Sequence, residues 1–339
     1  MSRLAIIVSA VVTVTALALP ASAAAPARIG GPERVATAAQ IADVAFPGGA
    51  SAAVIARSDD FPDALAASAL AGAVDGPVLL THPTRLSPQT AATLRRLAPG
   101  RVYLLGGATA VSDAVARTLG ANVDVVRIAG ADRYETAADV AREAVRVRGG
   151  IGVSAGRTTV LIASGQNAAD AVTSSSTAFA GGHPILLVTQ RTLPAPTRQA
   201  LRDLAPEGAV LLGGTATISA TVEAQIRDLG IAVTRVGGAT RFDTAERFAE
   251  FSVERFDQSD DQVVLTRGDL YPDALAGGPL AGKASAPILL TQSPTSLGGP
   301  AERYLSANCA DIDTVRALGG RAAISEAVLA RATAAATCD

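Results

Sequence analysis

The sequence predicts an α/β protein of three tandem Rossmann-like lobes with parallel sheets, arranged as an intramolecular pseudo-trimer. Three observations lead to this prediction: a unit of about 105 residues recurs three times, each unit alternates short apolar runs with helix-like segments, and the runs are apolar throughout. Strands that are apolar on both faces are typical of parallel sheets covered by helices on both sides. A chain of 339 residues that is 49% hydrophobic, with 32 Gly and 18 Pro, suits a large core with many short turns and excludes intrinsic disorder.

Four markers recur in the same order in every unit. The first is Arg-[Ile/Val]-[Gly/Ala]-Gly-x-x-Arg-x-x-Thr-Ala, which starts at Arg28, Arg127 and Arg235. The second is an Asp-Ala pair, with the aspartates Asp63, Asp170 and Asp273. The third is Pro-[Ile/Val]-Leu-Leu, which starts at Pro77, Pro184 and Pro287. The fourth is Leu-Gly-Gly followed by a serine, at Ser112, Ser219 and Ser325. Such recurrence indicates copies of one structural unit.

The elements are clearest in the second unit. Its predicted strands cover residues 159–163, 185–188, 210–212 and 233–236. Its predicted helices cover residues 170–179, 194–204 and 220–230, and a further helix opens the next unit. Gly165, Pro206 and the pair Gly213-Gly214 end segments, and Ser219 stands at an N-cap position. The resulting order is βαβαβαβα.

The units are larger than solenoid repeats, so we expect three compact lobes. The lobes must touch, because the fourth strand of one unit runs directly into the opening helix of the next. The first unit lacks a full strand before Arg28, and the third lacks a closing strand. We therefore expect the N-terminal segment to complete the third lobe and close a pseudo-threefold ring. The expected domains are a signal peptide at 1–23 and repeats at 24–126, 127–234 and 235–339.

The N-terminus indicates export. Arg3 precedes an apolar stretch at 4–19, Pro20 breaks it, and Ala21-Ser22-Ala23 has the small-x-small form of a signal peptidase site. A transmembrane anchor is the alternative, although it needs about 20 strongly apolar residues. After signal cleavage we expect a secreted protein with no membrane segment.

Cys309 and Cys338 are the two cysteines, and in an exported chain they are expected to pair. Two free thiols are the alternative. Zinc is poorly supported, because His82 and His183 do not lie at ligand spacing with either cysteine. No metal and no other cofactor are expected.

The charge pattern predicts that any recognition of an anion is made by arginine. Lys+Arg total 29 and Asp+Glu 31, with no long run of either sign, so the electrostatic pattern of a nucleic-acid binder is missing. Lys283 is the only lysine, and guanidinium groups suit bidentate contacts with phosphate or carboxylate. Aromatic residues make up 3% of the chain and Trp is absent, which argues against a lectin that stacks sugars on rings. An acidic glycan is the more plausible ligand.

The recurring Gly-x-[Asp/Glu/Thr]-Arg-x-x-Thr-Ala, Asp-Ala and Pro-[Ile/Val]-Leu-Leu segments resemble the cell wall-binding repeat 2 family of Gram-positive surface proteins, over residues 28–330. The resemblance implies a pseudo-trimer that attaches non-covalently to an anionic wall polymer. It also implies a binding role for three arginines and three apolar runs. By position these are Arg34, Arg133 and Arg241, with Val78-Leu79-Leu80, Ile185-Leu186-Leu187 and Ile288-Leu289-Leu290.

The copies depart from the pattern at several places. Val35 replaces the usual aromatic residue, Ala168-Ala169 replaces aromatic-Pro, and Arg316 interrupts an apolar strand. The three sites are therefore expected to differ in strength.

Structural roles compete with the binding roles. Each repeated arginine could form an ion pair with a repeated aspartate, Asp63, Asp170 or Asp273, or share itself between the aspartate and a ligand. The Ile-Leu-Leu runs could simply be core strands. The Gly-Gly turns lack the signatures of a nucleotide site, so no nucleotide is expected.

The expected function is that of a secreted, non-catalytic module and monomer that attaches to an anionic cell-wall polymer. The two histidines occupy non-equivalent places and supply no convincing catalytic base, and Ser174-Ser175-Ser176 is interpreted as a helix surface. Family members often carry a catalytic domain such as a peptidoglycan amidase, and we expect none here. The alternatives are a secreted amidase-like wall hydrolase and a soluble surface interaction protein.

Overall fold

The computed structural model describes residues 24–60, 63–270 and 273–338, and the predicted signal peptide lies outside them. Among these residues the strands form three sheets whose main strands are all parallel, in the orders β3-β2-β4-β5, β8-β7-β9-β10 and β12-β11-β13-β1. The first contains β2 (Ala52–Arg57), β3 (Val78–Thr81), β4 (Arg101–Leu105) and β5 (Asp124–Ile128). The second contains β7 (Arg157–Ser164), β8 (Ile185–Val188), β9 (Gly208–Leu212) and β10 (Ala232–Val236), with the short antiparallel β6 (Val153–Ser154). The third contains β11 (Gln262–Arg267), β12 (Ile288–Thr291), β13 (Thr314–Leu318) and β1 (Ala25–Ile29).

Helices cover both faces of each sheet, which confirms the predicted fold class. The helices that open the units are α1 (Arg34–Ala45), α5 (Arg133–Arg148) and α10 (Arg241–Arg255). The inner helices are α2 (Ala67–Ala73), α6 (Ala169–Thr173), α7 (Ser175–Gly181) and α11 (Gly278–Lys283). The outer helices are α3 (Pro88–Leu97), α4 (Asp113–Gly120), α8 (Ala195–Leu204), α9 (Ala220–Arg227), α12 (Gly299–Ala307) and α13 (Glu326–Ala335).

Each opening helix crosses from one lobe to the next. Strand β5 belongs to the first sheet, whereas α5, which follows it, packs on β8 of the second sheet. The same step leads from β10 to α10, which packs on β12. We call the first, second and third sheets with their helices lobes 1, 2 and 3. The recurring Gly-x-x-Arg segment is therefore the connection between lobes.

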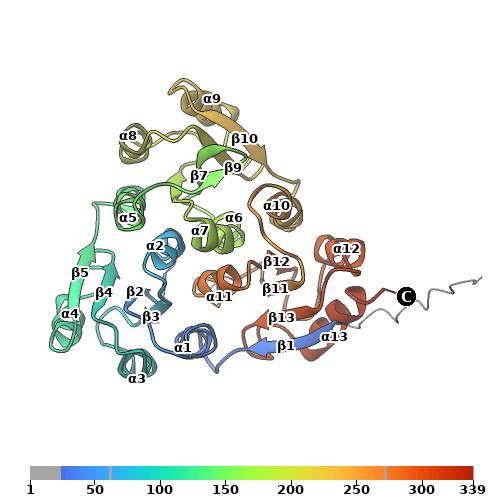
Figure 1. The fold of residues 1–339 in the computed structure, drawn as a ribbon, viewed down its shortest axis with the longest axis horizontal. Helices are drawn as coiled ribbons and strands as arrows, with labels where there is room; N and C mark the ends of the chain where they lie inside the picture. The colour runs from blue at the N-terminus through green and yellow to red at the C-terminus, as the bar shows by residue number, and fades with distance from the viewer. Residues whose placement is uncertain (1–23, 61–62, 271–272, 339) are drawn as a thin grey trace, which may run out of the picture.

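The N-terminal strand closes the ring, as predicted. Strand β1 lies parallel to β13, with Ala25 opposite Thr314 and Ile29 opposite Leu318. Figure 1 shows the blue β1 beside the red β13 in lobe 3, so the two ends of the chain share one sheet. Strand β1 thus lies inside the expected first repeat but completes the sheet of the third lobe, so repeat boundaries in sequence and sheet boundaries in space do not coincide.

Helices α2, α7 and α11 meet at the centre of the pseudo-trimer (Figure 1). Small residues let them approach closely: a Cβ at Gly72 would overlap the carbonyl oxygen of Phe179, and one at Gly278 would strike Ser68. The interpretation of Ser174-Ser175-Ser176 as a helix surface is wrong, because these serines are buried here. Their hydroxyls donate to the backbone carbonyls of Ala171, Val172 and Ala286, which satisfies them without solvent.

The N-caps of three helices and the pairing of the cysteines agree with the sequence. Ser112, Ser219 and Ser325 each cap a helix by accepting a backbone N–H three residues later. Cys309 and Cys338 form a disulfide that ties the end of α12 to the residues after α13. No helix within the described residues is both long and apolar enough to cross a bilayer.

Candidate functional site

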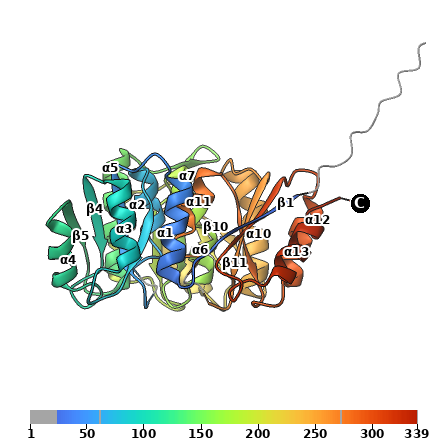
Figure 2. The ribbon, with the colours of Figure 1, turned by 90° about the horizontal axis from the view of Figure 1, so that it is seen from below.

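The three repeated arginines lie where the lobes meet, at the carboxyl ends of the strands. Each is the first residue of an opening helix, and each donates from Nη1 to a backbone carbonyl after the first strand of its lobe. The distances are 2.7 Å from Arg34 to Ser58, 2.7 Å from Arg133 to Gly165 and 2.9 Å from Arg241 to Gly268. The three arginines therefore occupy equivalent positions in the three lobes, each at the first turn of an opening helix; Figure 2 shows the ring of lobes edge-on.

A repeated threonine orients each opening turn. The hydroxyls of Thr37, Thr136 and Thr244 accept the backbone N–H of Gly31, Gly130 and Gly238. A Cβ at any of these glycines would overlap the first turn of the helix, so the turn can approach only glycine. This packing fixes the direction in which the arginine leaves the helix.

The repeated aspartates face the arginine of the next lobe, not of their own. Asp63 is influenced by Thr136 and Arg133, and Asp273 by Thr37 and Arg34. Asp170 is influenced by Arg241. Each carboxyl group also lies against the first glycine of its own Gly-Gly turn, at Gly106, Gly213 and Gly319. We call these places junction 1–2 (Asp63, Arg133), junction 2–3 (Asp170, Arg241) and junction 3–1 (Asp273, Arg34).

Burial raises the pKa of all three aspartates. For Asp63 and Asp273 the nearby arginines and a threonine hydrogen bond oppose the effect of burial. For Asp170, which is 3% exposed, burial raises the pKa to about 7, and Arg241 opposes it only in part. In each junction the arginine that lowers the pKa of the aspartate comes from the neighbouring lobe.

The arginines are nevertheless reachable from solvent. Arg34 is exposed, and Arg133 and Arg241 are half-buried. Each stands at a helix N-terminus, where backbone N–H groups also favour anions.

The apolar runs occupy a different environment. Their residues are at most 2% exposed: Val78, Leu79, Leu80, Ile185, Leu186, Leu187, Ile288, Leu289 and Leu290. They form the edge strands β3, β8 and β12 beneath the opening helices. In this conformation they support the arginine-bearing helices and offer no surface to a ligand.

Two charged pairs at the junctions were not singled out from the sequence. Arg57 bonds Asp59 through two nitrogens at 2.7 and 2.8 Å, and Arg267 bonds Asp269 in the same way at 2.9 and 2.6 Å. Both arginines also influence the aspartate of their lobe, Asp63 or Asp273. The recurrence of Arg-x-Asp after the first strand in two of three copies is the signal that could have found them.

The departure at Val35 has a structural counterpart. In lobe 2 a Cβ on Gly165 would lie 2.6 Å from Cε1 of Tyr134, so an aromatic residue after the arginine requires glycine at the strand end. In lobe 1 the strand-end residue is Ser58, and the smaller Val35 leaves room for its side chain. The surroundings of Arg34, at junction 3–1, therefore differ from those of the other two arginines.

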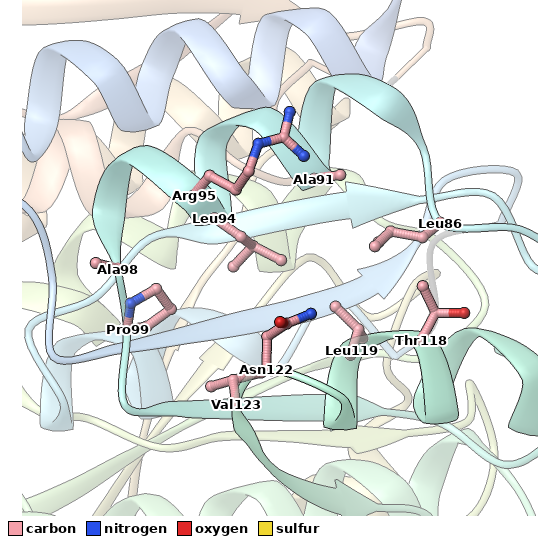
Figure 3. A pocket seen from close by; sticks show the side chains of 10 residues that line it. All are labelled: Leu86, Ala91, Leu94, Arg95, Ala98, Pro99, Thr118, Leu119, Asn122 and Val123. Carbon is pink, nitrogen blue, oxygen red and sulfur yellow. The ribbon is translucent and has the colours of Figure 1, made fainter.

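A cavity of about 400 Å³ lies apart from the junctions, between α3 and α4 of lobe 1. Figure 3 shows Leu86, Leu94 and Leu119 bordering it. In lobe 3 the equivalent groove is crossed by the ion pair of Glu302 and Arg331. Over the residues that the structure describes, no cluster of three or more His, Cys, Asp or Glu could hold a metal ion.

The sequence is similar to a known protein family and to curated relatives. A family model described as cell wall binding domain 2 matches residues 28–116, 127–223 and 235–329. The chain is 31% identical over 260 residues to the N-acetylmuramoyl-L-alanine amidase LytC of Bacillus subtilis (strain 168), covering 76% of this chain and 48% of the amidase. It is 28% identical over 239 residues to the amidase enhancer of the same organism, covering 70% of this chain and 31% of the enhancer.

Solved structures agree. Cwp6 from Clostridium difficile has a TM-score of 0.83 at 27% identity, covering 94% of this chain and 48% of that chain. Cwp8 from the same organism has a TM-score of 0.78 at 23% identity, covering 92% and 51%, which shows likeness of fold. The chain spans about half or less of the length of the curated relatives named above.

Proposed function

The chain belongs to the cell wall binding domain 2 family, and from this membership we propose that it is a secreted, non-catalytic monomer that attaches non-covalently to an anionic polymer of the cell wall. Membership supports binding to the cell wall. The acidic character of the ligand is our inference from the guanidinium groups at the junctions.

The observation that carries the proposal is the threefold recurrence of a solvent-accessible arginine at the N-terminus of an opening helix, held in each lobe by the same hydrogen bond to the end of the first strand. A polymer with repeated acidic groups can engage several such positions at once. Each engagement after the first is intramolecular, so weak individual contacts add to a firm attachment. The Ile-Leu-Leu strands contribute by holding the opening helices in place.

Co-sedimentation with isolated Gram-positive cell walls tests the proposal. The mature chain should sediment with intact walls, lose retention when their acidic polymers are stripped, and lose retention as salt is raised. Retention that survives both treatments would contradict an electrostatic attachment.

A triple variant, Arg34→Ala with Arg133→Ala and Arg241→Ala, should lower retention more than a hundredfold, because each lost charge-assisted contact costs about tenfold or more. Arg95→Ala is the matched control, since Arg95 is exposed on α3 and carries the same charge. Equal retention by the triple variant and the control would refute the assignment of the arginines.

The likeness to an amidase raises a second candidate, hydrolysis of the wall. The match covers 48% of that enzyme. Zymography on peptidoglycan separates the candidates, because our proposal predicts binding without clearing. A cleared band from the purified chain would support the hydrolase.

A further inference from the structure

The outer groove of lobe 1, between α3 and α4, is open, whereas side chains bridge the same groove in the other two lobes. Ala91, four residues after the N-cap of α3, and Thr118, six residues after the N-cap of α4, both line the cavity there. Counted in the same way, the residues of lobe 3 are Glu302 and Arg331, which form an ion pair at 2.8 Å. This pair divides the lobe 3 groove into two cavities, each lined by both residues.

Lobe 2 bridges its groove in another way. Gln225 occupies the position of Thr118, and its side-chain oxygen accepts the backbone N–H of Leu193 at 3.2 Å. Leu229 occupies the position of Asn122 and packs against the core of lobe 2. Lobe 1 thus has short or small side chains where lobes 2 and 3 have bridging or filling ones.

The missing bridge leaves two leucines of lobe 1 partly uncovered. Leu86 and Leu94 are half-buried, although both pack against the core. Their counterparts in lobes 2 and 3 are at most 5% exposed: Leu193, Leu201, Leu297 and Leu305. Apolar surface that stays in water is unfavourable, so a ligand that covers these leucines is stabilised by the hydrophobic effect.

The cavity has the size and lining of a site for a small aliphatic molecule. Its volume of about 400 Å³ lies in the range of pockets that hold small ligands. Figure 3 shows Leu94 pointing from α3 toward Leu119 and Asn122 on the opposite wall. The apolar residues that line the cavity are all aliphatic, so a saturated chain can pack against them, whereas stacking on a ring is not offered.

The helices that form the groove are positively charged. Together they contain three arginines and one acidic residue: Arg95, Arg96, Arg117 and Asp113. Asp113 pairs with Arg127, and Arg96 pairs with Asp43. Arg95 is the charged residue that lines the cavity, and over the described part of the chain it forms no ion pair. An anionic group at this rim therefore meets a guanidinium and no acidic lining residue.

We propose that the lobe 1 groove binds a free molecule that consists of an aliphatic chain and one carboxylate. The chain lies against Leu86, Leu94 and Leu119, and the carboxylate lies at Arg95, since one guanidinium matches one carboxylate in geometry and charge. Lobe 3 disfavours the same ligand, because the carboxylate of Glu302 lines both of its cavities. The site is separate from the three junctions, so this binding is independent of attachment to the wall.

Titration calorimetry of the full mature chain with decanoate, kept below its micelle-forming concentration, tests the proposal. Each buried methylene raises affinity about fourfold, so octanoate, which is two methylenes shorter, should bind about tenfold more weakly. Arg95→Ala should weaken decanoate binding about fivefold, because the lost contact is an exposed one. This exposed substitution is not expected to affect folding.

A second variant rebuilds the bridge of lobe 3 in lobe 1. Ala91→Glu with Thr118→Arg should weaken decanoate binding by more than about tenfold, because the pair occupies the groove and places a carboxylate in it. Ala114→Glu with Ala121→Arg is the matched control, since it adds the same residue types at exposed positions outside the lining. Exposed charges contribute little, so the control should bind within about twofold of the unmodified chain.

Several outcomes would overturn this inference and leave the proposed function intact. They are the absence of decanoate binding by the unmodified chain, equal affinity for octanoate and decanoate, and unchanged affinity in Arg95→Ala or in the bridged variant. Sedimentation with phosphatidylglycerol vesicles without binding of free decanoate would assign the groove to a membrane surface instead. Loss of wall retention in the bridged variant, but not in its control, would contradict a site separate from wall attachment.

Discussion

Two buried side chains of lobe 2 should make stability depend on pH in opposite directions. His183 is 1% exposed, its Nδ1 lies 2.9 Å from the carbonyl of Thr159, and its ring meets Phe256 edge-on at 4.6 Å. Burial lowers its pKa from 6.5 to about 4, aided by the charge of Arg148. Burial raises the pKa of Asp170 from 3.8 to about 7.

The signs follow from which state binds the proton. Between pH 6.5 and about 4 the unfolded chain protonates His183 and the folded chain does not, so acidification lowers the free energy of unfolding by about 3 kcal/mol. Between pH 7 and about 4 the folded chain protonates Asp170 and the unfolded chain does not, so acidification raises it by about 4 kcal/mol. In the unmodified chain the two contributions nearly cancel.

Two substitutions separate them. Asp170→Asn removes the compensating term, so relative to the unmodified chain its stability should fall by about 4 kcal/mol between pH 7 and pH 4. His183→Asn keeps a donor for Thr159 but does not titrate in this range, so its relative stability should rise by about 3 kcal/mol over the same interval. Other carboxyl groups are common to all three chains and drop out of the difference.

Urea denaturation followed by far-UV circular dichroism, at half-unit steps of pH, measures these differences. The reasoning requires difference curves of opposite slope for the two variants. Parallel curves for Asp170→Asn and the unmodified chain would show that the buried carboxyl titrates normally and would refute this reasoning.

Three further predictions concern binding, packing and the disulfide. Arg133→Ala should weaken wall retention about tenfold in co-sedimentation while the melting temperature changes little; a collapse of the fold instead would assign Arg133 to structure. Gly72→Ala should destabilise the chain by about 2 kcal/mol in urea titration, because its Cβ would overlap a backbone oxygen of lobe 2, whereas Gly107→Ala, with open space around it, should change stability by less than about 0.5 kcal/mol; equal effects would contradict tight axial packing. Replacing both Cys309 and Cys338 by Ser should cost about 3.5 kcal/mol in the same assay, since the bond closes a loop with a sequence separation of 29 residues, and an unchanged midpoint would rule out that contribution.

The sequence predicts the repeated parts of this molecule well, because the three copies provide three different sequences for the same strand or helix. Strand and helix order, the serine caps and ring closure by the N-terminal segment all follow from comparing three copies. The prediction of one helix over 170–179 is wrong, since the structure divides it into α6 and α7 at Ser174. The burial of the serines could not be read from one lobe, because their cover is supplied by the other lobes.

The same limit applies to the site. The arginines and aspartates were found as triplets, but their pairing was not, because it depends on each opening helix packing on the lobe that follows its strand. Asp63 meets Arg133, which lies closer in sequence to Asp170 than to Asp63. Only the crossover geometry reveals that a helix begins in one lobe and completes the site of another.

This crossover has a consequence for how one repeated unit can acquire distinct sites. Each junction takes its aspartate from one copy and its arginine from the next, so a change in a single copy alters one junction through its strand end and another through its opening helix. In the second copy, Arg133 belongs to junction 1–2, whereas Asp170 belongs to junction 2–3. In the closed ring, three similar sequences therefore form three junctions that can differ in chemistry. The shared core is not disturbed, because the differing residues lie at strand ends and helix starts rather than within the sheets.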